Sequence, residues 1–185
     1  GPVAVADVNA DGALDFLVCC TQETATSSSS TVLYLQQEDG SFEEAESDLM
    51  TGRDLSIADI DGDGALDLVV VGSDNTIVYF QQSDGSFEAA AAERDLNGGG
   101  SVSVADVNTD GSLDLLITGG YDGGSTLYLQ QPDTTFNVAD AGLTDVSGGD
   151  NSIADVNGDG TLDLLVSGDD PDNNESVSLY LQQSE

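Results

Sequence analysis

Short runs of apolar and β-branched residues alternate with polar turns along the whole chain, and this pattern repeats four times. In each repeat a β-prone run leads into an acidic segment, which an aliphatic run follows. A polar stretch then leads to a third run that contains aromatic and β-branched residues. Runs of this length between Gly-, Asp- and Ser-rich turns are typical of β-strands. The predicted third strands are Thr31–Gln37, Thr76–Gln82, Ser125–Gln131 and Ser178–Gln183.

A fourth strand is predicted in three of the repeats, after a short turn that contains Asp or Gly. These strands are Ser41–Ala45, Ser86–Ala90 and Thr134–Val138. The unit is therefore a four-stranded antiparallel meander, and the last repeat stops at its third strand. Glu88–Arg94 has the composition of a short helix, but the repeat requires strand and linker at this place.

The acidic segments begin at residues 7, 59, 106 and 155, so the repeats are 52, 47 and 49 residues long. Four-stranded units of roughly 40 to 50 residues are typical of the blades of a β-propeller. We therefore predict an all-β fold, a β-propeller of four-stranded antiparallel blades with four repeats in one domain, 1–185. The approximate repeat boundaries are 1–50, 51–97, 98–146 and 147–185.

The four acidic segments share one nine-residue pattern, Asp-x-Asp/Asn-x-Asp-Gly-x-Leu-Asp. Ca²⁺ takes six to eight oxygen ligands, and a tight loop supplies them when alternate residues point inward. We expect about four Ca²⁺ ions, one per repeat, with side-chain oxygens from positions 1, 3, 5 and 9 and a carbonyl from position 7. The predicted ligands are Asp7, Asn9, Asp11, Ala13, Asp15; Asp59, Asp61, Asp63, Ala65, Asp67; Asp106, Asn108, Asp110, Ser112, Asp114; and Asp155, Asn157, Asp159, Thr161, Asp163.

Two further expectations belong to the same loops. The glycine at the sixth position permits the sharp turn, and the leucine at the eighth position is expected to face the core in every loop. A simpler interpretation is that Asp-Gly turns only make good hairpins. Four copies of three or more close carboxylates favour a cation, because bare carboxylates repel one another. Mg²⁺ is disfavoured because it usually retains several waters.

The chain has 36 acidic residues against two arginines, with no lysine or histidine, and a formal charge of −34. Nucleic acids and anionic membranes are poor partners for such a surface, and no apolar run is long enough to span a bilayer. Cations are the natural partners. For the acids outside the loops, a solvated surface of a salt-adapted organism is an equal alternative.

The loops and the Asp-Leu-aliphatic strands that follow them resemble the FG-GAP and VCBS repeats of integrin α-subunit propellers and of many secreted or surface proteins. The Phe-Gly opening of that family is reduced here to segments such as Val102–Asp106, so the VCBS-like subclass is the nearer match. The resemblance implies a ring of blades, with the loop between the first two strands of each blade. It also implies a calcium-rigidified scaffold for adhesion to a protein or carbohydrate.

An extracellular or cell-surface location is expected, because simple calcium loops often bind at the roughly 10⁻⁴ to 10⁻³ M typical of extracellular modules. We expect no enzyme, since histidine, lysine and nucleophile motifs are missing. Carboxylate pairs for polysaccharide cleavage are a remote alternative. A lectin is another, with sugar stacking on Tyr34, Tyr79, Tyr128 or Tyr180, although sheet packing is favoured for these residues.

The ends of the chain lead to one more expectation. The first repeat begins directly at its first strand, and the last repeat lacks a fourth strand to complete its sheet. An exposed strand edge can pair with another chain. We therefore expect either a segment of a longer propeller or association with a second copy.

Overall fold

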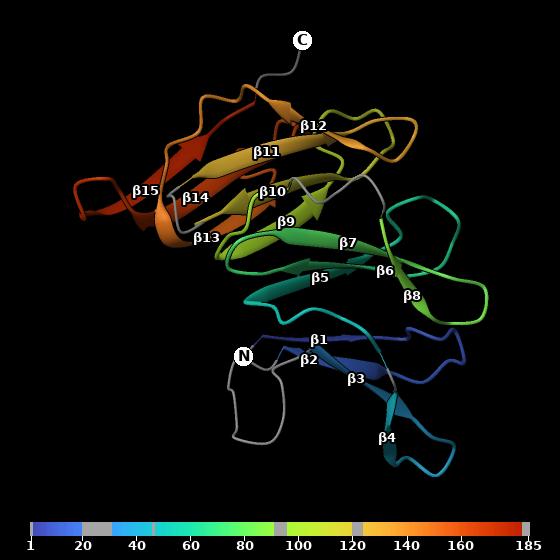
Figure 1. Cartoon of the computed structure of the whole chain (residues 1–185). Coiled ribbons are helices and arrows are strands. Elements are labelled where there is room, and N and C mark those ends of the chain that lie inside the picture. The colour runs from blue at the N-terminus through green and yellow to red at the C-terminus, as the bar shows by residue number, and fades with distance from the viewer. Residues whose placement is uncertain (1, 20–30, 46, 91–95, 120–123, 183–185) are drawn as a thin grey trace.

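The computed structural model describes residues 2–19, 31–45, 47–90, 96–119 and 124–182. All elements in these ranges are β-strands, and they form four antiparallel sheets in chain order (Figure 1). Across the same ranges, no helix has the length and apolar character needed to cross a membrane.

Each sheet is a meander in which consecutive strands are neighbours. Sheet 1 contains β1 (Val3–Ala6), β2 (Asp15–Cys19), β3 (Thr31–Gln36) and β4 (Phe42–Ala45). Sheet 2 contains β5 (Asp54–Ala58), β6 (Asp67–Val71), β7 (Thr76–Gln81) and β8 (Phe87–Ala89). Sheet 3 contains β9 (Ser101–Ala105), β10 (Asp114–Thr118), β11 (Ser125–Gln130) and β12 (Phe136–Ala139). Sheet 4 contains β13 (Ser147–Ala154), β14 (Asp163–Asp169) and β15 (Glu175–Tyr180).

The all-β class, the antiparallel meander and the three-stranded last sheet of the described chain confirm the predictions. The β8 strand confirms the choice of strand over helix at its position, and residues 91–94 of that segment lie outside the described ranges. The last strand was wrongly placed: β15 starts at Glu175 rather than Ser178. The preceding turn explains the shift, because Asn174 N donates to Asp170 Oδ1 and Asn173 has a positive φ of 59°, so pairing begins at the next residue.

Successive sheets stack face to face through alternating side chains of their second strands, since neighbours along a strand point to opposite faces. Leu17 of β2 shares an apolar cluster with Leu68 and Val70 of β6. On the other face of β6, Val69 and Val71 pack with Leu115 and Ile117 of β10. Both faces of sheets 2 and 3 are therefore covered, and all five residues of β6 and of β10 are buried. This double burial explains the nearly continuous aliphatic runs at the centre of each repeat.

The first strands of neighbouring sheets also lie against one another, so β9 contacts both β5 and β13. At the start of these strands the Ser101 hydroxyl lies 3.0 Å from Asp54 Oδ2 and 2.8 Å from Asp150 Oδ1. Asn151 Nδ2 donates to the Ser101 carbonyl oxygen at 3.0 Å. Polar side chains therefore join sheets 2, 3 and 4 near those ends of their first strands, β5, β9 and β13, that lie opposite the acidic loops.

A tyrosine in the third strand of sheets 2, 3 and 4 receives a backbone N–H from the segment that arrives from the preceding sheet. Met50 N donates to Tyr79 Oη and Asn97 N donates to Tyr128 Oη, each at 3.0 Å, and Thr144 N donates to Tyr180 Oη. Tyr79 and Tyr128 are buried. Burial at these two positions favours sheet packing over a sugar-stacking surface, as the sequence analysis preferred.

The expectation that the eighth loop residue always faces the core is wrong for Leu14, whose side chain is 59% exposed. Its counterpart Leu113 packs against the apolar cluster between sheets 2 and 3, so this position faces the preceding sheet. Sheet 1 has no preceding sheet in the described chain, and Leu14 therefore lies open. The second loop residue shows the mirror effect: Val8, Ile60 and Val107 face the next sheet and are buried, whereas Val156 of the last sheet is 53% exposed.

The hydroxyl of Tyr128 gives a direct test of this packing. Replacing Tyr128 by Phe leaves the Asn97 N–H without its acceptor in a partly buried place, which costs about 1–3 kcal/mol of unfolding free energy. Tyr34→Phe is the matched control, because Tyr34 receives no such N–H among the described residues. Chemical denaturation should show a loss for Tyr128→Phe and a change under about 0.5 kcal/mol for Tyr34→Phe. Equal losses would contradict the assigned role.

Candidate metal centre

The four acidic loops join the first and second strands of the four sheets, at β1–β2, β5–β6, β9–β10 and β13–β14. The first aspartate of each loop accepts a backbone N–H from the glycine at position 6, at 2.9–3.1 Å. Those glycines have φ between 89° and 94°, a left-handed conformation that is easy for glycine and strained for other residues. The predicted turn at Gly12, Gly64, Gly111 and Gly160 is confirmed.

The ninth aspartate of each loop has a role that the sequence analysis did not assign. Its side chain is buried, and in loop 1 Asp15 accepts the N–H of Val8 through Oδ2 at 3.0 Å and the N–H of Gln36 through Oδ1 at 2.8 Å. Asp67, Asp114 and Asp163 make the same pair of bonds, with N–O distances of 2.8 to 3.0 Å. One carboxylate therefore fixes the start of the loop to the end of the third strand.

The fourth loop residue is a second feature that the sequence analysis missed. It has a positive φ in every loop: 56° at Ala10, 77° at Gly62, 60° at Thr109 and 77° at Gly158. Glycine occupies two of the four positions, which is the only sequence signal of this conformation. At Ala10 and Thr109 the left-handed backbone is strained, and the surrounding hydrogen bonds must hold it.

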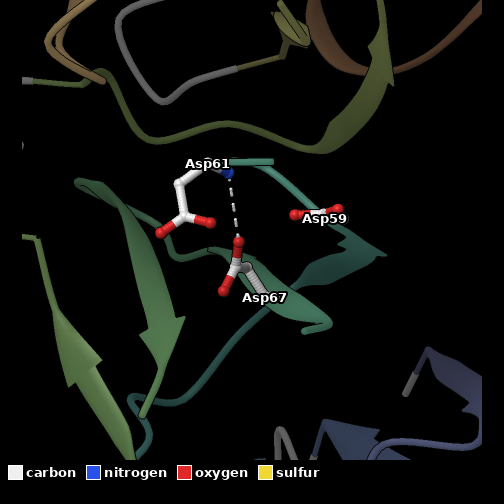
Figure 2. A group of neighbouring side chains, drawn as sticks. All are labelled: Asp59, Asp61 and Asp67. Atoms are coloured by element: carbon white, nitrogen blue, oxygen red, sulfur yellow. Dashed lines mark hydrogen bonds between the residues drawn. The ribbon is translucent and has the colours of Figure 1, made fainter. Parts of the chain in front are cut away.

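In the second loop three carboxylates come together. Asp59, Asp61 and Asp67 each place one carboxylate oxygen within 4.8 Å of the others. Figure 2 shows the three side chains. Asp61 N lies 3.4 Å from Asp67 Oδ2. Asp59 Oδ1 is buried and has no hydrogen-bond partner among the described residues. A buried anionic oxygen without a donor is costly, and two neighbouring carboxylates increase that cost, so a cation fits this group of residues.

Burial raises the pKa of Asp67 above its usual value, and the negative charge of Asp61 raises it further, while the N–H groups of Gln81 and Ile60 oppose the change. Burial likewise raises the pKa of Asp114, with further increases from Asp110 and Asp106. Exposed Asp110 behaves differently: hydrogen bonds from Ser112 N and then from the Asn108 amide lower its pKa. In loops 2 and 3 the charge of the buried ninth carboxylate, Asp67 or Asp114, is therefore disfavoured without a cation.

Of the predicted ligand sets, only that of loop 2 forms such a three-carboxylate group within the described residues. Asp63, also predicted there, instead accepts the N–H of Ala65 at 2.7 Å. In loops 1, 3 and 4 an asparagine replaces Asp61, and its amide nitrogen donates to the fifth aspartate at 2.8–3.0 Å. An asparagine at position 3 thus pairs with the next acid, whereas an aspartate there adds a third negative charge.

The family comparison agrees with these loops. The model of the FG-GAP-like repeat matches residues 7–70, 59–117 and 106–166. Each match begins at the first aspartate of one loop and ends in or beside the second strand of the next sheet. The chain belongs to the family of proteins with FG-GAP-like repeats. A search of curated protein sequences finds no match.

Several solved structures share the fold, and two of them illustrate the likeness. One is a lectin from Agrocybe aegerita, described as specifically recognising non-reducing terminal N-acetylglucosamine, with 21% identity and a TM-score of 0.59. The other is the Vibrio cholerae biofilm matrix protein Bap1, with 19% identity and a TM-score of 0.54. The matches cover 95% and 96% of this chain but only 50% and 26% of those chains. The chain thus spans half the length of the lectin.

The raised pKa values predict how the calcium-free chain responds to pH. Groups such as Asp67 and Asp114 bind more protons folded than unfolded between the usual value of 3.8 and their raised values, so stability falls as the pH rises through this window. In metal-free buffer, the melting temperature should be higher near pH 4.5 than at pH 7. Asp67→Asn combined with Asp114→Asn should flatten this dependence. A melting temperature that rises toward pH 7 would contradict the assignment.

Proposed function

We propose that the chain is a calcium-binding scaffold of β-propeller blades, displayed outside the cell for recognition of a carbohydrate or a protein. The observation that carries the calcium assignment is the group in loop 2, where the buried Asp59 Oδ1 has no donor in the part of the chain that the structure describes and lies beside Asp61 and Asp67. A divalent cation would supply the missing positive charge. Similar loops in the other three sheets give the expected number of about four ions.

Calcium acts in this proposal on the fold, by holding each loop against its sheet. The loop connects the first and second strands, and its ninth aspartate accepts a hydrogen bond from the backbone of the third strand. A cation bound to the outer carboxylates would fix the remaining part of the loop. Such a scaffold presents rigid connecting segments, on which binding residues are commonly carried. The loop carboxylates are proposed as calcium ligands, so none of them is assigned a catalytic role.

The propeller form is supported by the order of the sheets and by the way they stack. Four meanders follow one another along the chain, each packed face to face on the next, with their first strands side by side. Radial repetition of four-stranded sheets around their first strands is the arrangement of propeller blades. The location outside the cell is supported by the affinity range typical of simple calcium loops.

A carbohydrate ligand is supported by the lectin and by the biofilm matrix protein that share the fold. The buried Tyr79 and Tyr128 are not available for stacking on sugars, so a sugar site would use other residues, such as the partly buried Tyr34 and Tyr180 or residues of the connecting segments. A glycan array, probed with the calcium-loaded chain, separates a lectin from a scaffold for proteins: reproducible binding to one glycan class supports the lectin, and a blank array favours a protein ligand.

The calcium assignment is tested by Asp59→Asn, which removes a negative charge with little change in shape. Calorimetric titration should count about four Ca²⁺ in the parent chain and one fewer in the variant, because repeats couple mainly to their neighbours. Glu88→Gln is the control, since it removes the same charge from an exposed position of the same sheet. An unchanged count for Asp59→Asn, or an equal loss in the control, would exclude the site at loop 2.

A further inference from the structure

A polar cavity of about 420 Å³, open to solvent, lies near the starts of the first strands of sheets 2, 3 and 4. Its lining includes Asp54 of β5, Ser101 of β9 and Asp150 of β13, together with Ser167 of β14 and with Arg53, which precedes β5. The acidic loops follow these first strands at their other ends. The polar cavity is therefore separate from the candidate metal centre.

Glycines form the rest of the lining, and they allow the walls of the polar cavity to approach one another. These glycines are Gly100, Gly148, Gly149 and Gly168. A Cβ atom at Gly149 would lie 1.8 Å from the carbonyl oxygen of Ser167, and a Cβ atom at Gly100 would lie 2.8 Å from that of Gly149. No side chain fits at such distances, so glycine is required where these backbone segments meet. Part of the wall is therefore main chain, and no large apolar side chain lines the cavity.

The buried hydroxyl of Ser101 lies between two carboxylates of the polar cavity, 3.0 Å from Asp54 Oδ2 and 2.8 Å from Asp150 Oδ1. A hydroxyl has one hydrogen, so it donates to only one of these two oxygens. The N–H groups of Val102 and Asn151 donate to the same oxygens, at 3.0 and 2.8 Å. Asp54 Oδ1 and Asp150 Oδ2 accept no hydrogen bond from the described residues. The two carboxylates therefore keep acceptor oxygens for the O–H or N–H groups of a ligand.

Arg53 brings a positive charge to the same cavity. The chain has two arginines and no lysine or histidine, and Arg94 lies outside the described ranges, so Arg53 is the only cationic side chain that the structure describes. Its Nε donates to Ser73 Oγ at 3.1 Å, and it forms no ion pair with a carboxylate of the described residues. The two terminal nitrogens of its guanidinium are therefore available to donate to a ligand oxygen.

These groups favour a small, neutral ligand that has several hydroxyls. An anionic ligand would meet two carboxylates in a chain of charge −34, and a cationic ligand would meet the guanidinium of Arg53. Sites for small molecules usually have volumes of about 300–1,000 Å³ and mostly apolar linings. This cavity is at the small end of that range, and its lining is polar. Neutral carbohydrates have this size and supply both the donors and the acceptors that the lining needs.

We propose that the polar cavity binds one or two units of a neutral carbohydrate, whose hydroxyls donate to Asp54 and Asp150 and whose oxygens accept from Arg53. This inference rests on the proposed role in recognition, and it names the site and the class of ligand. Calcium makes no contact with the sugar, because the acidic loops lie at the other ends of β5, β9 and β13.

The test is an NMR titration of the isotope-labelled chain in saturating calcium. The probes are methyl glycosides of neutral hexoses and of N-acetylhexosamines, with glucuronate as an anionic probe and spermidine as a cationic one. At least one neutral sugar should shift the amide signals of Ser101 and Gly149 and saturate them as a single site. The proposal is overturned if no neutral sugar binds, or if either charged probe shifts these signals at lower concentration than every neutral sugar.

Two substitutions and one control assign the sugar to the polar cavity. Asp150→Asn and Arg53→Gln each remove one charged partner from an exposed position and keep a polar side chain there. Each should raise the dissociation constant of the sugar at least about tenfold, because hydrogen bonds to charged groups are the stronger ones. Glu88→Gln removes a charge from β8, the edge strand of sheet 2, and should leave the affinity unchanged. Circular dichroism checks that each variant keeps its sheets.

The same variants separate this inference from the proposed function. A neutral sugar that binds the parent chain, Asp150→Asn and Arg53→Gln with equal affinity would overturn the assignment to the polar cavity, while recognition of a carbohydrate would still stand. The calcium count is measured separately by calorimetry, so a failure of the calcium assignment is recognised independently of the sugar titration.

Discussion

The buried aspartate at the ninth position of each acidic loop is the constraint on which the rest of each repeat depends. Through its two oxygens, Asp15 joins the backbone of the loop to the backbone of the third strand, and the same bonds recur in all four sheets. A buried carboxylate with two backbone donors fixes the path of the chain on both sides of the second strand. The same carboxylate also lies next to the other acids of its loop. The residue that fixes the loop backbone therefore adds to the negative charge that a bound cation would neutralise.

The second constraint is the alternation of side chains along the second strand of each sheet. In β6, Leu68 and Val70 pack toward sheet 1 while Val69 and Val71 pack toward sheet 3. A strand of this kind is stable only between two other sheets, because each of its faces is apolar. Each repeat therefore packs between the repeats before and after it. In the described chain, the outer faces of sheets 1 and 4 are not covered by another sheet.

Much of this architecture could be predicted from the sequence, because the repeated pattern carries it. The Asp-Gly loops and aliphatic runs indicate the strands and their order, and the repeat correctly favours a strand at Phe87–Ala89 over the helix that the local composition suggests. The pattern of one repeat does not indicate whether another sheet packs on each of its faces. Leu14 has the same loop position as Leu113, yet it is exposed because the described residues contain no sheet on that side of it.

The candidate site was also only partly predictable. The nine-residue pattern indicates which oxygens lie in each loop, but not which of them the backbone already uses, and Asp63 and Asp15 both accept N–H groups of the chain. The left-handed backbone at Ala10 and Thr109 leaves no sequence signal, because alanine and threonine are unusual in that conformation. Nor does the pattern distinguish loop 2, where Asp61 replaces asparagine and gathers three carboxylates.

The central claim is that calcium stabilises the fold through these loops, and thermal unfolding with and without calcium tests it most directly. Calcium at a hundredfold excess over its dissociation constant contributes about 2.7 kcal/mol at each site, so four sites contribute roughly 11 kcal/mol, which is comparable to the whole stability of a typical domain. We expect the melting temperature in saturating calcium to exceed that in chelator by more than about ten degrees. An identical melting temperature in both buffers would contradict the claim.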